Sequence, residues 1–245
     1  MLREALIRNN EAGPHGFRWR SNEISRIEGL SDAVFAFAIT LLIVSLEVPR
    51  TFTELFETMR GFLPFAISFA MLAQIWYIQF GWFRRYGLQD TTTFTLNTVL
   101  LFVVLFYVYP LKFLFTYLTS LAIGGHGLAR MPNGQLEPML QGNDGYVMML
   151  VYNAGFISVF AVFVLLYIHA WRKRDVLVLN AAERNETIER LGSNVCFVSI
   201  GAVSLAVVLF GGPAFTGWAG LVYMLIAPVL TVYRTLMGRR QRRTA

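Results

Sequence analysis

The sequence predicts an all-α integral membrane protein, and three observations lead to this fold class. Of the 245 residues, 56% are hydrophobic and only 15% are charged, whereas a soluble domain carries about 25% charged residues. The mean hydropathy is +0.52. The apolar residues gather in six runs comparable to the roughly 20 residues that a helix needs to cross hydrocarbon. Too little polar surface remains for a soluble globule, and 21 Phe, 10 Tyr and 5 Trp exclude a disordered chain.

Each apolar run predicts one transmembrane helix within a single transmembrane domain that covers residues 1–245. The predicted helices span residues 30–48, 62–82, 93–118, 146–171, 195–210 and 215–237. The last two are separated only by the short sequence Gly-Gly-Pro-Ala, which predicts a tight turn and an antiparallel helix hairpin. Pro64, Pro110 and Pro228 lie inside or near the ends of helices, where a membrane bundle tolerates them because neighbouring groups satisfy the freed carbonyls.

The Lys and Arg residues predict the orientation of these helices. Most of the 21 lie in the leading segment, after the second and fourth helices, and in the tail. The opposite side has Arg50, Arg60 and Arg130, with Lys112 near the outer half of the third helix. Because cytoplasmic loops carry the excess of Lys and Arg, we predict that both termini are cytoplasmic. We interpret the net charge of +6 as a topology signal, and we expect no nucleic-acid partner.

Two loops differ from simple connections. Residues 120–145 are Gly-rich, nearly uncharged and on the predicted outer side, which favours a cap over a domain. Residues 172–194 mix acidic and basic side chains on the predicted cytoplasmic side. Glu186 and Arg190 are four residues apart, a spacing at which opposite charges stabilise a helix. We therefore expect a cytoplasmic extension of a helix in this loop.

The residues that carry enzyme chemistry are missing from this sequence. It has no H-E-x-x-H, P-loop, G-x-S-x-G or C-x-x-C pattern. Cys196 is the single cysteine, and His15, His126 and His169 fall in three separate segments, so we expect no metal site, no cofactor and no enzyme activity. His169 is interpreted as an interfacial residue. The T-V-G-Y-G carbonyl filter and an Arg-rich voltage-sensor helix are absent as well.

The first predicted helix differs from an ordinary apolar transmembrane helix, because it carries polar residues at its inner end. Counting back about 20 residues from Pro49 places Ser31 and Asp32 at the edge of the hydrocarbon. A carboxylate deep in a bilayer costs roughly 2.5–3.5 kcal/mol, so such a residue usually faces a protein interior or a water-filled path. Alternatively, Ser31 or Asp32 caps the helix N-terminus. The sequence leaves both interpretations open for Asp32.

Helix geometry separates the polar residues of this first helix. Arg26 and Asp32 are six positions apart, about 120° around a helix, and cannot pair within it. If both are buried, each needs a partner on another helix or another subunit. Phe37, Thr40, Leu41 and Val44 follow one side, which is apolar apart from the Thr40 hydroxyl. Periodicity alone favours packing against a neighbouring helix over the lining of a pore, because a Thr hydroxyl can bond to its own turn.

The same segment resembles a known family. Arg26-x-x-x-Leu30-Ser31-Asp32, followed by an apolar run to Leu42, resembles the R-x-x-x-F-S-D signature that opens the first helix of the transmembrane protein 175 family. These are potassium-permeable channels of endosomes and lysosomes, with prokaryotic members of one repeat. The likeness continues through later positions and covers most of the chain, namely Pro64, Ser68-Phe69, Trp76, Asn97, Pro110 and His169-Ala170-Trp171-Arg172.

The resemblance implies a homotetrameric potassium channel with six transmembrane helices per subunit, in the plasma membrane of a prokaryote. Its pore would be lined by the first helix of each subunit. It would pass K⁺ and other monovalent cations, and it would hold no resident metal. By position, the apolar constriction would be Phe37, Leu41 and Val44, and Thr40 would supply the hydroxyl for ion preference. A polar network at the inner ends of the helices would contain Arg26, Ser31, Asp32, Trp76, Gln79 and Asn97.

Three positions depart from the family pattern. Leu30 stands where the signature has Phe, and Gln79 stands where a W-x-x-H pattern has His. Phe37 stands where Ile or Leu is usual at the constriction, and four Phe rings around an axis would fill more space. Because an amide does not titrate as an imidazole does, Gln79 argues against proton-linked behaviour through this position.

Three other functions compete with the channel. A proton- or ion-coupled secondary transporter would use Asp32 as its coupling carboxylate, but such carriers usually have broken helices at matching positions of two repeats, and no such pair is present. A lipid-modifying enzyme would need His or carboxylate residues clustered at one membrane depth. A regulatory subunit would not conduct alone. We favour the channel, with the carrier second.

Overall fold

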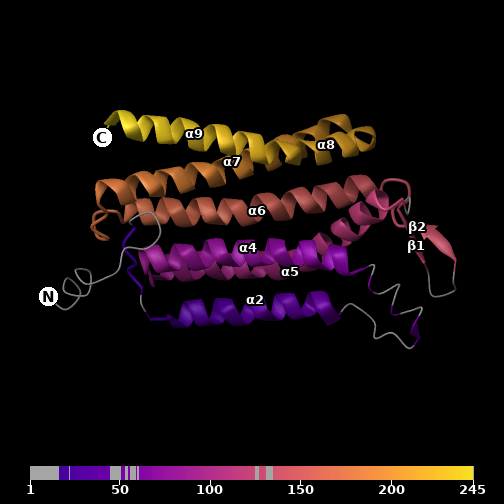
Figure 1. Cartoon of the computed structure of the whole chain (residues 1–245), viewed down its shortest axis with the longest axis horizontal. Helices are drawn as coiled ribbons and strands as arrows, with labels where there is room; N and C mark the ends of the chain where they lie inside the picture. Colours follow the sequence, from indigo (N-terminus) through magenta and orange to yellow (C-terminus); the bar gives the residue numbers. More distant parts are fainter. Residues whose placement is uncertain are drawn as a thin grey trace.

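The computed structural model describes residues 17–21, 23–44, 51–52, 55, 59, 61–124, 127–130 and 135–244. Within these residues, long helices lie side by side along one axis (Figure 1). The elements in chain order are α2 (Arg26–Val44), α4 (Phe62–Tyr86), α5 (Thr91–Ala122), β1 (Leu128–Arg130), β2 (Leu136–Pro138), α6 (Asp144–Arg172), α7 (Ala181–Gly211), η2 (Pro213–Phe215), α8 (Thr216–Val222), η3 (Tyr223–Leu225) and α9 (Ile226–Thr244).

The helices form a row in which each packs on its neighbours. α2 packs on α4 and α5, α5 packs on α6, α6 packs on α7, and α7 packs on α8 and α9. The core lies where α4, α5 and α6 meet, and its largest fully buried side chains include Trp82, Tyr86, Phe163 and Tyr167. Because α2 lies at one edge of the row, one of its sides is not packed against another described helix (Figure 1).

Local signals explain the turns at one end of the row. α4 ends at Gly87, whose positive φ of 56° suits glycine, and whose N–H donates to the Phe83 carbonyl. α5 begins after Asp90, whose side chain accepts a hydrogen bond from the Thr93 N–H. α7 begins after Asn180, which forms a reciprocal capping box with Glu183.

Five described stretches have the length and composition to cross a membrane. They are Phe62–Tyr86, Thr91–Ala122, Asp144–Arg172, Ala181–Gly211 and Pro213–Arg239. They correspond to the second to sixth predicted helices. The first predicted helix, residues 30–48, begins earlier than expected, at Arg26, and is described as far as Val44; residues 45–48 lie outside the described residues. The count of six spans therefore stays a prediction.

Three expectations about the elements need correction or extension. The fifth helix begins at Ala181 and not at residue 195, because the cytoplasmic extension expected from Glu186 and Arg190 is continuous with it; Arg190 Nε donates to Glu186 Oε1 at 2.8 Å. The sixth is not one α-helix, since a 3₁₀ turn, η3, interrupts it at Tyr223–Leu225. Within residues 120–145 the otherwise all-helical fold also contains two short strands, β1 and β2, which pair antiparallel.

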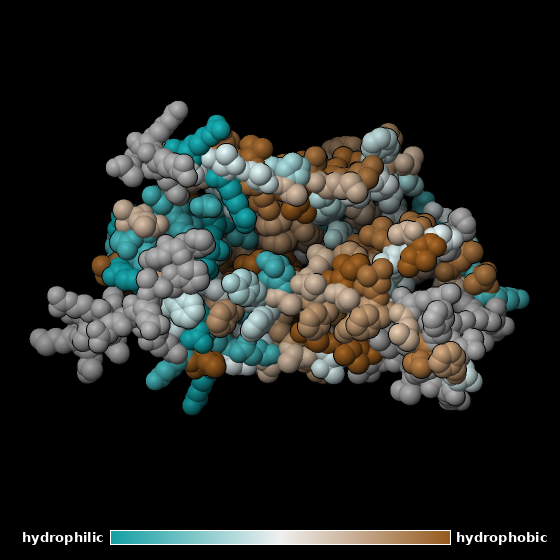
Figure 2. Space-filling model, in the orientation of Figure 1, coloured by the Kyte–Doolittle hydropathy of each residue, from teal (hydrophilic) through white to brown (hydrophobic). Residues whose placement is uncertain are grey.

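The surface of the bundle separates polar from apolar side chains along its length. Figure 2 shows hydrophilic side chains gathered at the end where α6 passes into α7, and hydrophobic side chains along the middle. Exposed apolar residues include Phe102, Phe106, Phe210 and Trp218. An apolar surface of this extent is typical of a protein that faces hydrocarbon.

Candidate functional site

The two sides of α2 have different environments. Ser31, Phe35, Ala38 and Leu42 are buried against the rest of the bundle. On the other side, Phe37 is 57% exposed, and Leu30, Ala33 and Thr40 are exposed near it. Since these positions follow one another at helical spacing, α2 presents a continuous, mostly apolar face that the described residues leave exposed.

The residues predicted for the constriction are placed differently from one another. Phe37 is exposed, whereas Leu41 is half-buried and packs against the core. The backbone of Val44 is described and its side chain lies outside the description. Thr40 is exposed, and its hydroxyl donates to the Ala36 carbonyl at 2.9 Å. A hydroxyl that donates to its own helix still has lone pairs, so Thr40 can accept a hydrogen bond or face a cation.

A chain of hydrogen bonds joins α2, α5 and α4 on the buried side of α2. Asn97 Nδ2 donates to Ser31 Oγ at 2.9 Å, and Gln79 Nε2 donates to Asn97 Oδ1 at 2.5 Å. The Ser31 hydroxyl in turn donates to the Ile27 carbonyl at 2.8 Å. Ser31, Gln79 and Asn97 are all buried. Because buried polar groups are costly when unpaired, this chain of bonds fixes α2 against both neighbours.

Asp32 lies beside this chain and binds a different partner. Trp76 Nε1 donates to Asp32 Oδ1 at 2.8 Å. Asp32 is exposed and lines a small pocket with Glu28, Trp76, Gln79 and Arg84. The capping alternative for Ser31 and Asp32 is wrong, because α2 begins at Arg26, a full turn and more before them.

The residues that cap α2 are Ser25 and Glu28. The Glu28 N–H donates to Ser25 Oγ at 3.2 Å, and the Ser25 N–H donates to Glu28 Oε1 at 3.2 Å. This reciprocal pair is a capping box. The sequence analysis missed it, although the spacing Ser-x-x-Glu before an apolar run is its usual signal. Glu28 is buried, so the box is shielded from competing water.

Arg26 is the one member of the predicted network that lies apart. It is exposed and makes no hydrogen bond or ion pair with another residue in the described part of the chain. Arg26 belongs to the same exposed side of α2 as Leu30 and Phe37. Among the described residues, Arg26 therefore makes no contact with the other members of the predicted network by hydrogen bond or ion pair.

A charged cluster holds the corner between α4 and α5 to the end of α6. Asp90 accepts hydrogen bonds from His169 Nε2 at 2.9 Å and from Lys173 Nζ. Partial burial opposes ionisation of Asp90, but the hydrogen bonds from Lys173, Thr93 and His169 outweigh it and hold the pKa of this carboxyl well below its usual range. His169 thus has a structural partner at the polar end of the bundle.

The chain is similar to one protein-family model and to known proteins. The family described as "Endosomal/lysosomal potassium channel TMEM175" matches residues 26–107, which contain α2, α4 and the first half of α5. A potassium channel of Marivirga tractuosa is 37% identical over 230 residues, 93% of each chain. A potassium channel of Chamaesiphon minutus is 30% identical over 173 residues, 67% of this chain and 74% of the relative.

Solved structures show the same fold. A crystal structure of a variant of the potassium channel MtTMEM175, in complex with a nanobody–MBP fusion protein, matches with a TM-score of 0.79 and 36% identity, over 93% of this chain and 98% of that chain. A lysosomal potassium-selective channel TMEM175 homologue from Chamaesiphon minutus matches with a TM-score of 0.54 and 22% identity, over 89% and 99% of the two chains. This second likeness concerns the fold alone.

The apolar helices and their polar ends define a helical integral membrane protein. Its near full-length likeness to a potassium channel, together with the family match over α2 to α5, identifies it further. The chain belongs to the TMEM175 family of potassium channels.

Proposed function

We propose that this chain is the subunit of a homotetrameric, potassium-permeable channel of a prokaryotic plasma membrane, with six transmembrane helices per subunit and both termini in the cytoplasm. In this proposal, α2 of each subunit faces a common axis. The observation that carries the proposal is the exposed face of α2 with Leu30, Phe37 and Thr40. A mostly apolar face at the edge of the row, opposite a side fixed by buried hydrogen bonds, suits a helix that lines a pore between subunits.

The constriction in this proposal is made by Phe37, Leu41 and Val44, without a carbonyl filter. Apolar rings can close a pore by dewetting. An ion that loses much of its hydration at such a ring meets a barrier, and potassium gives up water more easily than sodium does. The Thr40 hydroxyl, which keeps its acceptor lone pairs, favours the partly dehydrated cation. Selectivity of this kind is leaky and not strict, and it depends on both the apolar constriction and the Thr40 hydroxyl.

The polar network and Arg26 have distinct parts in the proposal. Ser31, Gln79 and Asn97 hold α2 to α4 and α5 by the hydrogen bonds described above. Asp32 and Trp76 add a second link between α2 and α4. Arg26, exposed on the same side as Phe37, is placed to find its partner on an adjacent subunit.

Bi-ionic flux measurements on the purified protein in liposomes test this proposal. We expect Phe37→Ala to widen the path and raise K⁺ flux, and Thr40→Ala to lower the preference for K⁺ over Na⁺. Matched controls are Phe102→Ala, an exposed ring on α5, and Thr98→Ala, whose hydroxyl likewise donates to its own helix at the Phe94 carbonyl. Unchanged flux and selectivity in both α2 variants would rule out this face as the pore. Currents no larger than a carrier's turnover, abolished by Asp32→Asn, would favour the transporter.

A further inference from the structure

The segment before α2 lies across the polar end of the bundle and is held by main-chain contacts. We refer to residues 17–21 as the strap. The Arg20 N–H donates to the Arg84 carbonyl at 2.9 Å, and Arg84 Nη1 donates to the Ser21 carbonyl at 3.0 Å. At Gly87, a Cβ would come within 3.1 Å of the Arg20 carbonyl oxygen. The backbone of the strap can therefore lie close to the turn after α4 because residue 87 is a glycine.

An aromatic side chain anchors the first residue of the strap. Phe17 is almost completely buried and meets the Tyr86 ring edge to face at 5.7 Å between centroids. The guanidinium of Arg20 lies 5.5 Å and that of Arg85 lies 5.9 Å from the centre of the Phe17 ring. Burial of a Phe side chain is worth roughly 1.5–3 kcal/mol, so the strap has an apolar anchor as well as hydrogen bonds.

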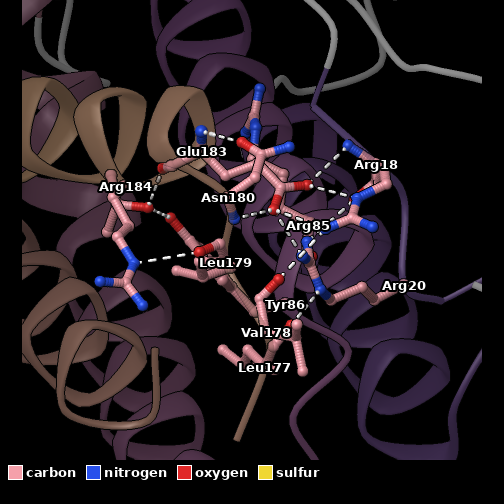
Figure 3. Close-up of polar contacts among 11 residues, drawn as sticks. Arg18, Arg20, Arg85, Tyr86, Leu177, Val178, Leu179, Asn180, Glu183 and Arg184 are labelled. Atoms are coloured by element: carbon pink, nitrogen blue, oxygen red, sulfur yellow. Dashed lines mark hydrogen bonds and ion pairs between the residues drawn. The ribbon is translucent and has the colours of Figure 1, made fainter. Parts of the chain in front are cut away.

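A buried carboxylate at the start of α7 receives both arginines of the strap (Figure 3). Glu183 is 1% exposed. Arg20 Nη2 lies 2.6 Å from Glu183 Oε2, and Arg18 Nε lies 3.3 Å from Glu183 Oε1. The main-chain N–H of Arg18 also donates to Glu183 Oε1, at 3.1 Å. Because a buried charge without its partner is strongly destabilising, Glu183 and the strap depend on each other.

The loop before α7 is shaped to meet the same arginines. Arg18 Nη2 donates to the Val178 carbonyl and Arg20 Nε donates to the Leu177 carbonyl, both at 3.1 Å (Figure 3). Val178 has a φ of 50°, which is unfavourable for a β-branched residue. Strained backbone persists where surrounding contacts over-determine it. Here the strained residue is Val178, whose carbonyl accepts the hydrogen bond from Arg18 of the strap.

A side-chain contact links the strap to the capped end of α2. Ser21 Oγ lies 3.4 Å from Glu28 Oε1, the carboxylate oxygen that also accepts from Ser25. A line of bonds thus runs from Glu183 through the strap to the first turn of α2. We propose that Glu183, through the strap, positions the inner end of α2; its consequence for conduction rests on the proposed function of α2 as the pore helix.

Hydrogen exchange and flux on the full-length protein test this proposal with Glu183→Gln. Glutamine keeps the capping box with Asn180 but removes the charge that Arg18 and Arg20 bind. We expect the amides of residues 17–21 and of the first two turns of α2 to exchange at least about tenfold faster, as for lost charge-assisted hydrogen bonds. We expect K⁺ flux to fall at least about threefold and the ratio of K⁺ to Na⁺ flux to stay unchanged. This combination is expected of a residue that positions the pore helix and does not itself line the pore.

The matched control is Glu186→Gln, one turn along α7. Glu186 makes ion pairs with Arg85 and Arg190 and none with Arg18 or Arg20. Because Arg85 also lies over the Phe17 ring, exchange at residues 17–21 should change far less than in Glu183→Gln. If Glu183→Gln does not fold, Arg18→Gln leaves Glu183 and Arg20 paired and should show the same changes at smaller size. Faster exchange in the strap without a change in α2 overturns the proposal, as does native exchange in both. Absence of K⁺ flux from the native protein would overturn the proposed function alone, because the exchange result does not depend on conduction.

Discussion

Gln79 shows how one side chain alters what a site can do. It donates to Asn97 between α4 and α5, and Asn97 donates to Ser31 on α2. The family pattern places a histidine at this position, and an imidazole changes its charge near neutral pH. An amide supplies the same kind of hydrogen bond without a titratable proton. The link between the three helices should therefore be insensitive to pH in the physiological range.

Asn97 is the residue on which this chain of bonds depends. Asn97→Ala leaves the Gln79 amide and the Ser31 hydroxyl buried without this partner, and one such group costs about 1–3 kcal/mol. We expect a clear drop in the thermal midpoint of the purified protein in detergent. Thr98→Ala, at the neighbouring exposed position with a local bond to Phe94, should change the midpoint little. Equal midpoints for the two variants would show that the buried amides find other partners.

Asp90 provides a stability term that depends on pH. Its pKa in the folded protein is held below the ordinary value by Lys173, Thr93 and His169, despite partial burial. The unfolded carboxyl titrates near pH ~3.9, so this stabilisation is fully present above that pH and is lost as the pH falls below it. The thermal midpoint of the native protein should exceed that of Asp90→Asn at pH 7, and the difference should narrow below about pH 4.

A matched control for Asp90 is Asp175→Asn. Asp175 is 70% exposed and pairs with Arg184 on the surface, where an ion pair is worth little. Its midpoint difference from the native protein should be small at every pH. A difference for Asp90→Asn that stays constant between pH 7 and pH 3 would contradict the role of the ionised carboxylate.

At the scale of helices, apolar runs predict the membrane part of an element better than its ends. The positions of the second to fourth helices follow the sequence closely, because their caps and charges stand beside the apolar runs. α2 and α7 begin earlier than their apolar runs, since polar turns extend a helix into water. The capping boxes at Ser25–Glu28 and Asn180–Glu183 were the available signals. The three-residue strands β1 and β2 are too short to give an alternating pattern.

The candidate site was only partly predictable from the sequence. The resemblance groups Ser31, Gln79 and Asn97, but only the packing of α2, α4 and α5 decides which atoms bond. Glu183 stands among basic residues in the stretch that the sequence predicts as a loop, and its burial against Arg18 and Arg20 is a long-range contact without a local signal. The roles of Phe37 and Thr40 at a pore remain predictions, because they depend on contacts between copies of the chain.

The contact of α5 with α6 depends on a glycine. A Cβ at Gly155 would lie 2.2 Å from Cδ2 of the buried Tyr107 ring. Gly155→Ala therefore forces the two helices or the ring to move, and overpacking of this kind costs about 1–3 kcal/mol. We expect a lower thermal midpoint and faster hydrogen exchange in α5 and α6.

Gly217 on α8 is the matched position for this comparison, since a Cβ there meets no atom within 4 Å. Gly217→Ala should leave the midpoint unchanged or raise it, because alanine is favoured over glycine in a helix. A midpoint for Gly155→Ala equal to that of Gly217→Ala would show that Tyr107 moves aside without cost.

At the scale of the whole molecule, a row of helices leaves two edges open. At one edge is the exposed face of α2, and at the other is the stretch Pro213–Arg239. Only 6% of the most apolar 18-residue segment of that stretch is buried. Lipid satisfies an apolar helix face as well as another helix does, so this second edge needs no protein neighbour. α2 carries Arg26 on its exposed side, and a cation there needs water or a partner.

The positive charges at one end of the row predict how the molecule sits in the membrane. The strap, the turn between α6 and α7 and the end of α9 lie at the same end of the bundle, where hydrophilic side chains gather (Figure 2), and β1 and β2 lie at the other (Figure 1). By the preference of Lys and Arg for the cytoplasm, Glu23 and Asp175 should be cytoplasmic, and Gln141 should be outside. All three are exposed.

A Cys196→Ala background, which removes the single cysteine, allows this orientation to be measured with introduced thiols. In intact cells, a membrane-impermeant maleimide should label Gln141→Cys, whereas Glu23→Cys and Asp175→Cys should react only after the membrane is permeabilised. Between Glu23 and Asp175 the chain passes through α2, α4, α5 and α6. The two residues lie on the same side of the membrane if the number of crossings is even, and on opposite sides if it is odd. Labelling of Glu23→Cys and Asp175→Cys from opposite sides would mean that α2 does not cross the bilayer, and a helix that does not cross cannot line a path for ions.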